Sequence, residues 1–380
     1  MTVFLGCGFA AKYLEGGGNF SVPLQWMLGL RRLRQDAIWL EWLPGTSDPA
    51  RDQACIVNFQ RQLRAHGLGG RYCLLYAQNA AEVHDLETVR CIGLSRRELR
   101  HRLKGPNVLL NLAYSLHPPL LLEFERRIFC DLDPSEIFYW MTKLDLGQTH
   151  HHEFWTIGLN LGSPDCKLPK SPLPWHTFYP LVDTELMQPQ ALPRRPKLTT
   201  IGQWYWGGAV EVEGEFPDLA KGQAFAPYLD LPRRVPSATW ELAMNISPDD
   251  PEAERLRGFG WRLVAPHQVA RTPAKYRRYL VSASAEFTAI KGVDVSWQTG
   301  WISDRAAAFL ALGRPVITED TGADKYLPAE SGMFFVANAE AAAAAAERVL
   351  REPKSLGRAA RACAVEVFDS AKNLRRILAL

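Results

Sequence analysis

Residues 301–322 read WISDRAAAFLALGRPVITEDTG, and this stretch predicts a helix followed directly by a strand. Ser303 is a favourable helix N-cap residue, Asp304 suits the first turn, and the alanine-rich run RAAAFLAL favours a helix. Gly313 and Pro315 end that helix, and the β-branched run that follows predicts a buried parallel strand. A helix and strand in such close succession are typical of α/β units, in which helices cover a parallel sheet.

Both ends of this unit carry groups that can bind an anion. The start of the predicted helix presents unpaired backbone N–H groups beside Ser303 and Arg305, an arrangement suited to a pyrophosphate. The predicted strand leads into Asp320, Thr321 and Gly322, and ligands of open α/β sheets bind beyond the carboxyl ends of the strands. We therefore predict an anion site here; a capped helix with a packing role alone is the alternative.

The alternation of strand-like and helix-like segments extends over most of the chain. Strand-like runs include TVFLGC at 2–7, AIWLEWL at 37–43 and NVLLNLA at 107–113. The proline-rich segment 164–196 interrupts the pattern, because proline neither sustains a helix nor fits a central strand. The pattern resumes with KLTTIG at 197–202. We therefore expect two α/β domains joined near this proline-rich segment.

The composition is that of a globular protein and argues against several other classes. The 380 residues are 47% hydrophobic and 22% charged. The seven cysteines are scattered and never form C-x-x-C, so they indicate neither a disulfide framework nor a zinc site and fit a reducing cytosol. A net charge of +3 does not require nucleic acid, and the basic clusters lack interleaved aromatic residues. We expect a cytoplasmic protein with no signal peptide, transmembrane segment or nucleic-acid partner.

A glycine loop precedes the first predicted helix. Residues 16–30 read GGGNFSVPLQWMLGL and place Gly17, Gly18 and Asn19 at the helix start, where backbone N–H groups can receive an anion or a sugar hydroxyl. A flexible turn is the alternative. The loop is neither a P-loop nor a G-x-G-x-x-G after the strand, so we do not expect a dinucleotide-dependent oxidoreductase.

Two other motifs suggest a metal site, but neither has the full pattern of one. Asp131 and Asp133 have a spacing that can hold a divalent ion on a diphosphate, yet Asp133 precedes Pro134, and Asp-Pro commonly opens a turn. The histidines at 150–152 lack the spacing of a zinc site. We predict no bound metal, and we regard one of these histidines as a candidate general base.

These motifs resemble those of a known family. EFTAIKGVDVSWQTGWISDRAAAFLALGRPVITEDTGADKYLP at 286–328 and EVFDSAKNLRRIL at 366–378 are similar to the C-terminal half of bacterial glycosyltransferase-like proteins of the two-domain GT-B type. GGGNFSVPLQWMLGLRRL at 16–33, DLDPSEIFYW at 131–140 and the segment HHHEFWTIGLNLGSPDCKLPKSPLPW at 150–175 resemble its N-terminal half. The resemblance covers nearly the whole chain and is most specific in the C-terminal motifs.

The resemblance implies two Rossmann-like α/β domains that face a central cleft. Residues 1–180 would form the acceptor-side domain, residues 181–365 the donor-side domain, and 366–380 a C-terminal helix that packs back on the first domain. The implied donor-binding residues are Glu286, Lys291, Ser303, Asp304, Arg305, Thr321 and Gly322. Gly17, Gly18 and Asn19 would face the cleft from the acceptor side, and His151 is the implied catalytic residue.

The implied activity is transfer of a sugar from a nucleotide-diphospho-sugar to a small-molecule, lipid or glycan acceptor, without a metal or other cofactor. The chain departs from the family at Glu319 and Ala306, where glutamine and serine are usual. The E-x7-E pattern of many retaining enzymes would fall on Gly300 and Ala308. Inverting and retaining outcomes therefore both stay open, and His151 would suit inversion. A catalytically silent nucleotide- or sugar-binding protein on the same fold is the alternative.

Overall fold

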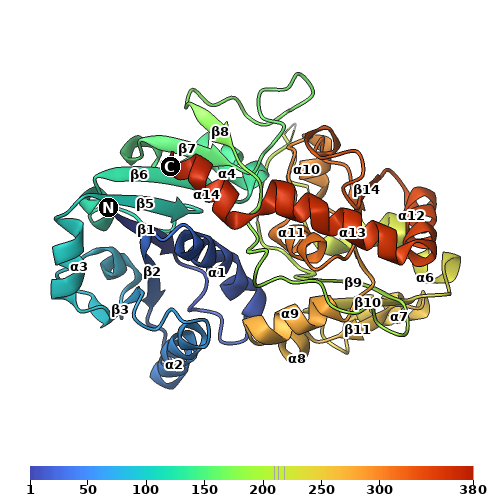
Figure 1. Cartoon of the computed structure of the whole chain (residues 1–380), viewed down its shortest axis with the longest axis horizontal. Helices are drawn as coiled ribbons and strands as arrows, with labels where there is room; N and C mark the ends of the chain where they lie inside the picture. The colour runs from blue at the N-terminus through green and yellow to red at the C-terminus, as the bar shows by residue number, and fades with distance from the viewer. Residues whose placement is uncertain (209, 213, 218, 380) are drawn as a thin grey trace.

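The chain folds around two β-sheets with helices packed against them (Figure 1). A computed structural model describes residues 1–380 except 209, 213, 218 and 380. The expected mixed α/β architecture, with two mostly parallel sheets, is confirmed. Among the described residues, no helix is both long enough and apolar enough to cross a membrane.

The first sheet has eight strands in the order β4-β3-β2-β1-β5-β6-β7-β8. They are β1 (Thr2–Cys7), β2 (Asp36–Pro44), β3 (Tyr72–Ala77), β4 (Arg90–Gly93), β5 (Asn107–Leu112), β6 (Arg126–Asp131), β7 (Glu153–Thr156) and β8 (Trp175–Thr177). Only β3 and β4 pair antiparallel. The central strands are buried because both faces of the sheet are covered; every residue of β5 is buried, its two asparagines included.

The second sheet has six strands, all parallel, in the order β11-β10-β9-β12-β13-β14. They are β9 (Lys197–Gly202), β10 (Thr239–Met244), β11 (Arg262–Val264), β12 (Ala285–Thr288), β13 (Val316–Glu319) and β14 (Met333–Val336). The proline-rich segment lies between the sheets in the chain, and it contains only the short edge strand β8, the kind of position in which prolines are tolerated.

Helices surround both sheets. Those of the N-terminal part are α1 (Gly17–Arg32), α2 (Pro49–Ala65), α3 (Arg96–Leu103) and α4 (Pro134–Met141). Those of the C-terminal part are α5 (Lys221–Phe225), α6 (Leu231–Arg234), α7 (Pro251–Gly258), α8 (Pro266–Ala270), α9 (Pro273–Val281), α10 (Gly292–Ser296), α11 (Asp304–Ala311), α12 (Ala339–Arg351), α13 (Pro353–Cys363) and α14 (Ser370–Leu378). Short 3-10 turns span Ala80–His84, Leu120–Glu123, Gln148–His150, Ala226–Tyr228 and Asp324–Tyr326, and a π-turn at Ala364–Phe368 joins α13 to α14.

The unit at 301–322 has the predicted form. Ser303 caps α11, because its side chain accepts a hydrogen bond from the backbone N–H of Ala306 at 3.0 Å. Gly313 follows the helix with a positive φ of 69°, a conformation that costs glycine little, and β13 begins three residues later. The start of α11 therefore lies at the carboxyl edge of the second sheet, which faces the first.

The C-terminal helix returns to the N-terminal part of the molecule. Helix α14 packs against α1, where a Cβ atom on Gly29 would lie 2.7 Å from the side chains of Leu374 and Ser370. Arg126 at the start of β6 donates hydrogen bonds to the carbonyls of Ile377 and Leu378, each at 3.3 Å. The two parts are thus joined by the proline-rich segment and by the α13–α14 segment (Figure 1).

Candidate functional site

A cavity of about 540 Å³ lies between the two parts of the molecule and is lined by both. The N-terminal part contributes Phe9, Glu15, Gly16, Gly17, Gly18, Asn19, Val22 and Asp133. The C-terminal part contributes Ile201, Gly202, Gln203, Trp206, Leu219, Lys221, Asn245, Pro266, Ala270, Tyr276, Lys291, Trp301, Ser303, Asp304 and Arg305. The structure therefore brings the predicted glycine loop and the predicted Ser303–Arg305 segment to one site.

Two helix N-termini open into this cavity from opposite sides. Helix α1 begins after Gly16 with no side-chain cap, and the backbone N–H groups of Gly17, Gly18 and Asn19 have no hydrogen-bond acceptor among the described residues. Helix α11 begins at Asp304. Unpaired N–H groups and the positive ends of both helix dipoles therefore point toward one space, which favours an anion with several acceptor oxygens.

The glycines of the loop have different structural requirements. A Cβ atom on Gly17 would lie 2.3 Å from the carbonyl oxygen of Ala270 and 2.4 Å from that of Thr272. A Cβ atom on Gly18 would lie no closer than 3.6 Å to Tyr276, which is ordinary contact. Gly17 is thus where α1 and the turn between α8 and α9 approach too closely for any other residue, and this close approach shapes one wall of the cavity.

Arg305 is held in place by the body of the second sheet. Its guanidinium donates to the carboxylate of Glu286, to the Ile201 carbonyl at 2.7 Å and to the Thr288 hydroxyl at 3.0 Å. Burial by itself lowers the pKa of Arg305, but the charge of Glu286 outweighs it and raises that pKa. The side chain keeps 17% of its surface exposed, and it presents a fixed positive charge at the cavity wall.

Glu286 lies behind Arg305, not in the cavity. Its side chain is fully buried on β12, and one oxygen accepts hydrogen bonds from Arg305 and from the Thr200 hydroxyl. The other oxygen has no partner among the described residues. Glu286, which the resemblance implied for donor binding, therefore serves as the buried counter-ion of Arg305 in this structure.

Lys291 forms an ion pair across the cavity. Its Nζ atom lies 2.7 Å from both carboxylate oxygens of Asp133 and 3.0 Å from Oε1 of Glu136. Burial lowers the pKa of Lys291, but the charges of Asp133, Asp294 and Glu136 outweigh it and raise that pKa above its ordinary value. Trp206 donates its Nε1 hydrogen to the same Glu136 oxygen at 2.6 Å. Lys291, which the resemblance implied for donor binding, thus links the two parts of the chain.

Asp131 and Asp133 have different surroundings. Asp131 is buried, accepts hydrogen bonds from the Thr156 hydroxyl and from the Asp133 backbone N–H, and has a pKa raised to about 7 by burial. Asp133 instead faces the cavity and Lys291. Over the part of the chain that the structure describes, no three acidic, histidine or cysteine side chains are grouped to hold a metal ion.

Lys221 is a site residue that the sequence did not reveal. It lines the cavity at the start of α5 and donates a hydrogen bond to the Ala289 carbonyl. Burial, followed by the nearby charges of Arg305 and Lys291, lowers the pKa of Lys221 to about 7. The surrounding letters LAKGQAF carry no pattern that distinguishes this lysine from a surface lysine, so only the folded arrangement brings it to the site.

His151 does not line the cavity. The ring is only 8% exposed, its Nδ1 atom lies 2.6 Å from the Gly147 carbonyl oxygen, and its Nε2 atom lies 3.1 Å from Nδ2 of Asn111. Burial lowers the pKa of His151 to about 4. A neutral ring that donates from Nδ1 and accepts at Nε2 satisfies both contacts and leaves no nitrogen for a substrate proton. This placement gives the predicted catalytic role of His151 no support.

Thr321 and Gly322 also lie outside the cavity lining. Thr321 is buried and donates to the Trp301 carbonyl at 2.8 Å, while Gly322 has a φ of 81° and would clash with Asn160 if it carried a Cβ. Asn160 donates to the Gln298 carbonyl at 2.8 Å and accepts from the Tyr326 hydroxyl at 3.0 Å. These residues therefore form a junction between the two parts, beside the site.

A scan of protein-family models and a search of curated proteins find no match to this sequence. Solved structures match over the full chain. Sucrose-phosphate synthase from Thermosynechococcus elongatus has a TM-score of 0.56 and 12% identity, Anabaena HepE in complex with UDP and glucose has 0.56 and 10%, and an alpha-glucosyltransferase in complex with UDP and a DNA 13-mer has 0.59 and 10%. Each match covers 100% of this chain and 98% of the other. The expected GT-B fold, with two Rossmann-like domains, is thereby confirmed.

Proposed function

We propose that this protein is a glycosyltransferase that moves a sugar from a nucleotide-diphospho-sugar to an acceptor. The observation that carries the proposal is the cavity between the two parts of the chain, where the open N-termini of α1 and α11 lie with Lys221 and Arg305. A diphosphate supplies the charge and the acceptor oxygens that such a site requires. Similar folds have been solved in complex with UDP or UDP-glucose, which supports a nucleotide-sugar donor.

The chemistry of the proposal is displacement of a nucleoside diphosphate from the anomeric carbon of the sugar. Negative charge develops on the leaving phosphate as the glycosidic bond breaks. In the proposal, the N–H groups at Gly17–Asn19 and at Arg305, together with the charges of Lys221 and Arg305, stabilise that charge. Because side chains supply this positive charge, the proposed reaction needs neither a metal ion nor another cofactor.

We assign the removal of the acceptor proton to Asp133 in place of His151. A group that receives this proton has to reach the cavity, and Asp133 lines it from the N-terminal part while His151 is buried elsewhere. Asp133 is held by Lys291 at 2.7 Å, which fixes the carboxylate in the cavity. The assignment applies to an inverting displacement; a retaining displacement would not require this base.

Several expectations from the sequence stay predictions. They are the domain limits at 180 and 365, the cytoplasmic location, the small-molecule, lipid or glycan acceptor, and the absence of a nucleic-acid partner. All seven cysteines are free thiols in the structure. The acceptor is expected to approach from the side of Asp133, because the proposed phosphate site lies between the N-termini of α1 and α11.

The proposal is tested by calorimetric titration with UDP, GDP and ADP, followed by assays of nucleoside diphosphate release from sugar nucleotides in buffer with EDTA. We expect one nucleoside diphosphate to bind and its sugar conjugate to turn over. Binding without release from any donor–acceptor pair would favour the silent binding protein. Failure of all three nucleotides to bind would contradict the glycosyltransferase proposal and a nucleotide-binding role.

A further inference from the structure

A second cavity of about 780 Å³ lies on the outer surface of the C-terminal part, between α13 and the proline-rich segment. None of its lining residues also lines the cavity between the two parts. Its apolar lining comes from Pro189, Ala191, Leu192, Leu312, Pro353, Ala362 and Val365. Its basic lining comes from Arg314, Lys354, Arg358, Arg361 and Lys372, with Glu366 as the single acidic side chain. We call this cavity the α13 groove.

The sequence of α13 produces a basic outer side and an apolar inner side. Leu356, Ala360 and Cys363 are buried at helical spacing. Lys354 and Arg358, four residues apart, are exposed on the opposite side. A Cβ atom on Gly357 would lie 2.8 Å from the Gly313 carbonyl, so two glycine backbones let α13 rest directly on the turn after α11. Gly313 and Gly357 both line the groove.

The positive charge of the α13 groove is only partly balanced by carboxylates, because Glu366 is the single acidic lining residue and Asp369 acts on Arg361. Arg314 is only 2% exposed, yet its guanidinium bonds only to the carbonyls of Gln190, Ala191 and Val281, and its Nε atom has no partner among the described residues. Burial lowers the pKa of Arg314. Arg361 similarly donates to three backbone carbonyls. Buried cations are ordinarily paired with an anion, so Arg314 lacks the partner that its charge calls for.

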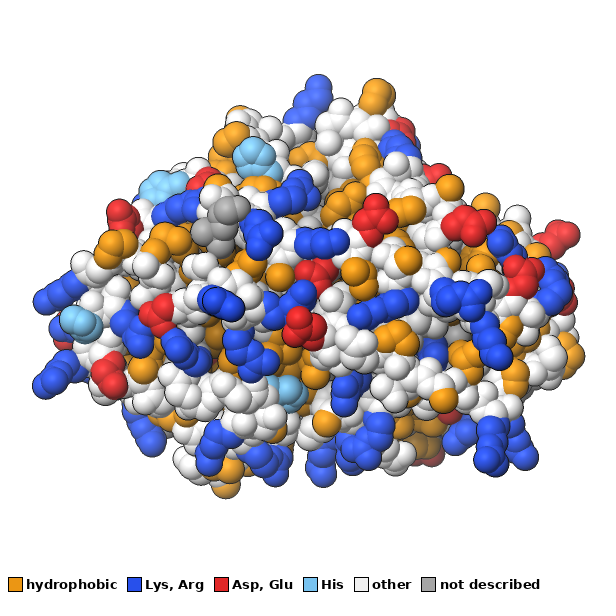
Figure 2. Space-filling view, in the orientation of Figure 1, with side chains coloured by type: hydrophobic (Ala, Val, Ile, Leu, Met, Phe, Trp, Pro, Cys, Tyr) orange, Lys and Arg blue, Asp and Glu red, His pale blue; other side chains and the backbone are white. Residues whose placement is uncertain are grey.

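We propose that the α13 groove binds an anionic phospholipid at a membrane surface, with the phosphate at the basic rim and acyl carbons on the apolar floor. The apolar floor offers few hydrogen-bond partners to the backbone of a peptide, which argues against a peptide ligand. Long basic side chains surround this floor, and an anionic lipid has the corresponding arrangement of acyl carbons beside a charged phosphate. The basic side chains continue onto α14 through Arg375 and Arg376, both exposed. Lys and Arg predominate over Asp and Glu on the face that carries α13 and α14 (Figure 2). An extended surface of this kind fits a membrane better than a single small anion.

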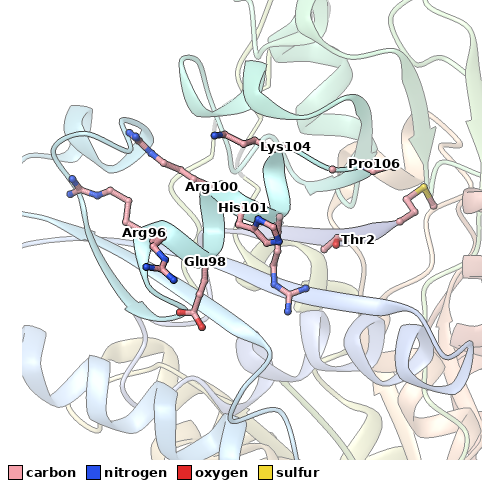
Figure 3. A pocket seen from close by; sticks show the side chains of 11 residues that line it. Thr2, Arg96, Glu98, Arg100, His101, Lys104 and Pro106 are labelled. Atoms are coloured by element: carbon pink, nitrogen blue, oxygen red, sulfur yellow. The ribbon is translucent and has the colours of Figure 1, made fainter.

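Another basic depression, of about 1110 Å³, surrounds α3 and provides a matched control (Figure 3). Its basic residues are Arg96, Arg97, Arg100, His101, Arg102 and Lys104. Arg100 and Arg102 are paired with Glu87 and Asp36. The apolar residues of α3, Leu99 and Leu103, are buried beneath the helix and do not line the depression. It therefore has comparable charge but fewer apolar residues, since Met1 and Pro106 are the apolar ones among its described lining residues.

The test is co-sedimentation with vesicles of phosphatidylcholine alone or with phosphatidylglycerol added, in the absence of any nucleotide sugar. We expect wild-type protein to bind only the anionic vesicles. The double variant K354E/R358E should reduce binding at least tenfold, because each basic side chain at a membrane surface contributes about 1 kcal/mol. The control R97E/K104E changes the net charge equally and should stay within twofold of wild type. None of these four side chains makes a hydrogen bond or ion pair with a described residue, so both variants should fold.

A third variant, V365D, places a charge on the exposed apolar floor and should also reduce binding to anionic vesicles. Excess inorganic phosphate should not displace the protein from the vesicles. The proposal is overturned if anionic vesicles do not bind, if R97E/K104E weakens binding as much as K354E/R358E, if V365D binds as wild type, or if phosphate alone displaces the protein. Because no sugar nucleotide is present, these outcomes are independent of the glycosyltransferase proposal.

Discussion

The guanidinium of Arg305 donates its Nε hydrogen to Glu286, a carboxylate with no exposed surface. This pair couples the start of α11 to the centre of the second sheet, because Glu286 lies in β12 and Arg305 in the first turn of the helix. The cavity wall is therefore set by a buried charge pair, and Arg305 has little freedom to reorient when a ligand arrives.

The first prediction concerns this pair. Arg305→Gln and Glu286→Gln should each lower the free energy of unfolding by about 3–5 kcal/mol, because each leaves one buried charge without its partner. The double variant should be less destabilised than the sum of the two singles, and urea denaturation of all four proteins measures the difference. Strictly additive losses would show that the two side chains do not interact as described.

The second prediction concerns Lys221. With a pKa of about 7 in the free protein, Lys221 is increasingly neutral above pH 7, and a bound diphosphate favours its charged form. The affinity for the nucleoside diphosphate that binds should therefore fall between pH 7 and pH 9, by at most about tenfold per pH unit. Lys221→Met should bind more weakly at pH 7 and lose this dependence. Calorimetry measures the affinity of both proteins as a function of pH. The same pH dependence in wild type and Lys221→Met would show that Lys221 does not bind the phosphates.

The same pKa shift has a consequence for stability. Lys221 has its ordinary pKa near 10.4 in the unfolded chain and about 7 in the folded protein, so the unfolded state binds more protons between these values. The contribution of Lys221 to stability thus rises with pH over this window, opposite to its effect on ligand affinity. Rising pH therefore weakens ligand binding by the wild-type protein but increases the contribution of Lys221 to its stability. A comparison with Lys221→Met can thus distinguish a lost ligand contact from a loss of folding.

The third prediction uses two adjacent glycines. Gly17→Ala should weaken nucleoside diphosphate binding and lower the free energy of unfolding by about 1–3 kcal/mol, because its Cβ would meet backbone atoms of Ala270 and Thr272. Gly18→Ala meets only the Tyr276 ring at ordinary contact distance and serves as the matched control. Thermal denaturation with and without the nucleotide measures both effects. Equal behaviour of the two variants would contradict the close approach at Gly17.

The fourth prediction separates Asp133 from His151 in turnover. Asp133→Asn should lower kcat at least a hundredfold if transfer is inverting, since general-base catalysis contributes factors of this size. Glu136→Gln is the control, because Glu136 also contacts Lys291 but does not line the cavity. His151→Gln should lower stability and leave kcat within a few-fold of wild type. If the His151→Gln variant is fully folded and yet loses turnover, His151 would be the base in place of Asp133.

The sequence predicts local features of the site well. The Ser303 cap, the length of α11, the strand after it and the helix start at the glycine loop all depend on residues adjacent in the chain. Local capping and turn preferences determine such features, so a single sequence reveals them.

The pairing of side chains across the molecule is not visible in the same way. Glu286 and Thr321 have polar side chains that suggested ligand contact, yet both are buried against other parts of the protein. Lys291 meets Asp133, which is 158 residues away in the chain. Lys221 reaches the site only through the folding of the second sheet. Burial and long-range pairing depend on how the two sheets face each other, and local preferences carry no information about that.

The most direct test of the central claim is an experimental structure of the protein with the nucleoside diphosphate that binds most tightly. The account predicts the diphosphate between the N-termini of α1 and α11, with its oxygens in hydrogen-bond contact with backbone N–H groups from both helices and with the Lys221 ammonium. A nucleotide bound outside this cavity, or one that contacts only one of the two helix ends, would contradict it.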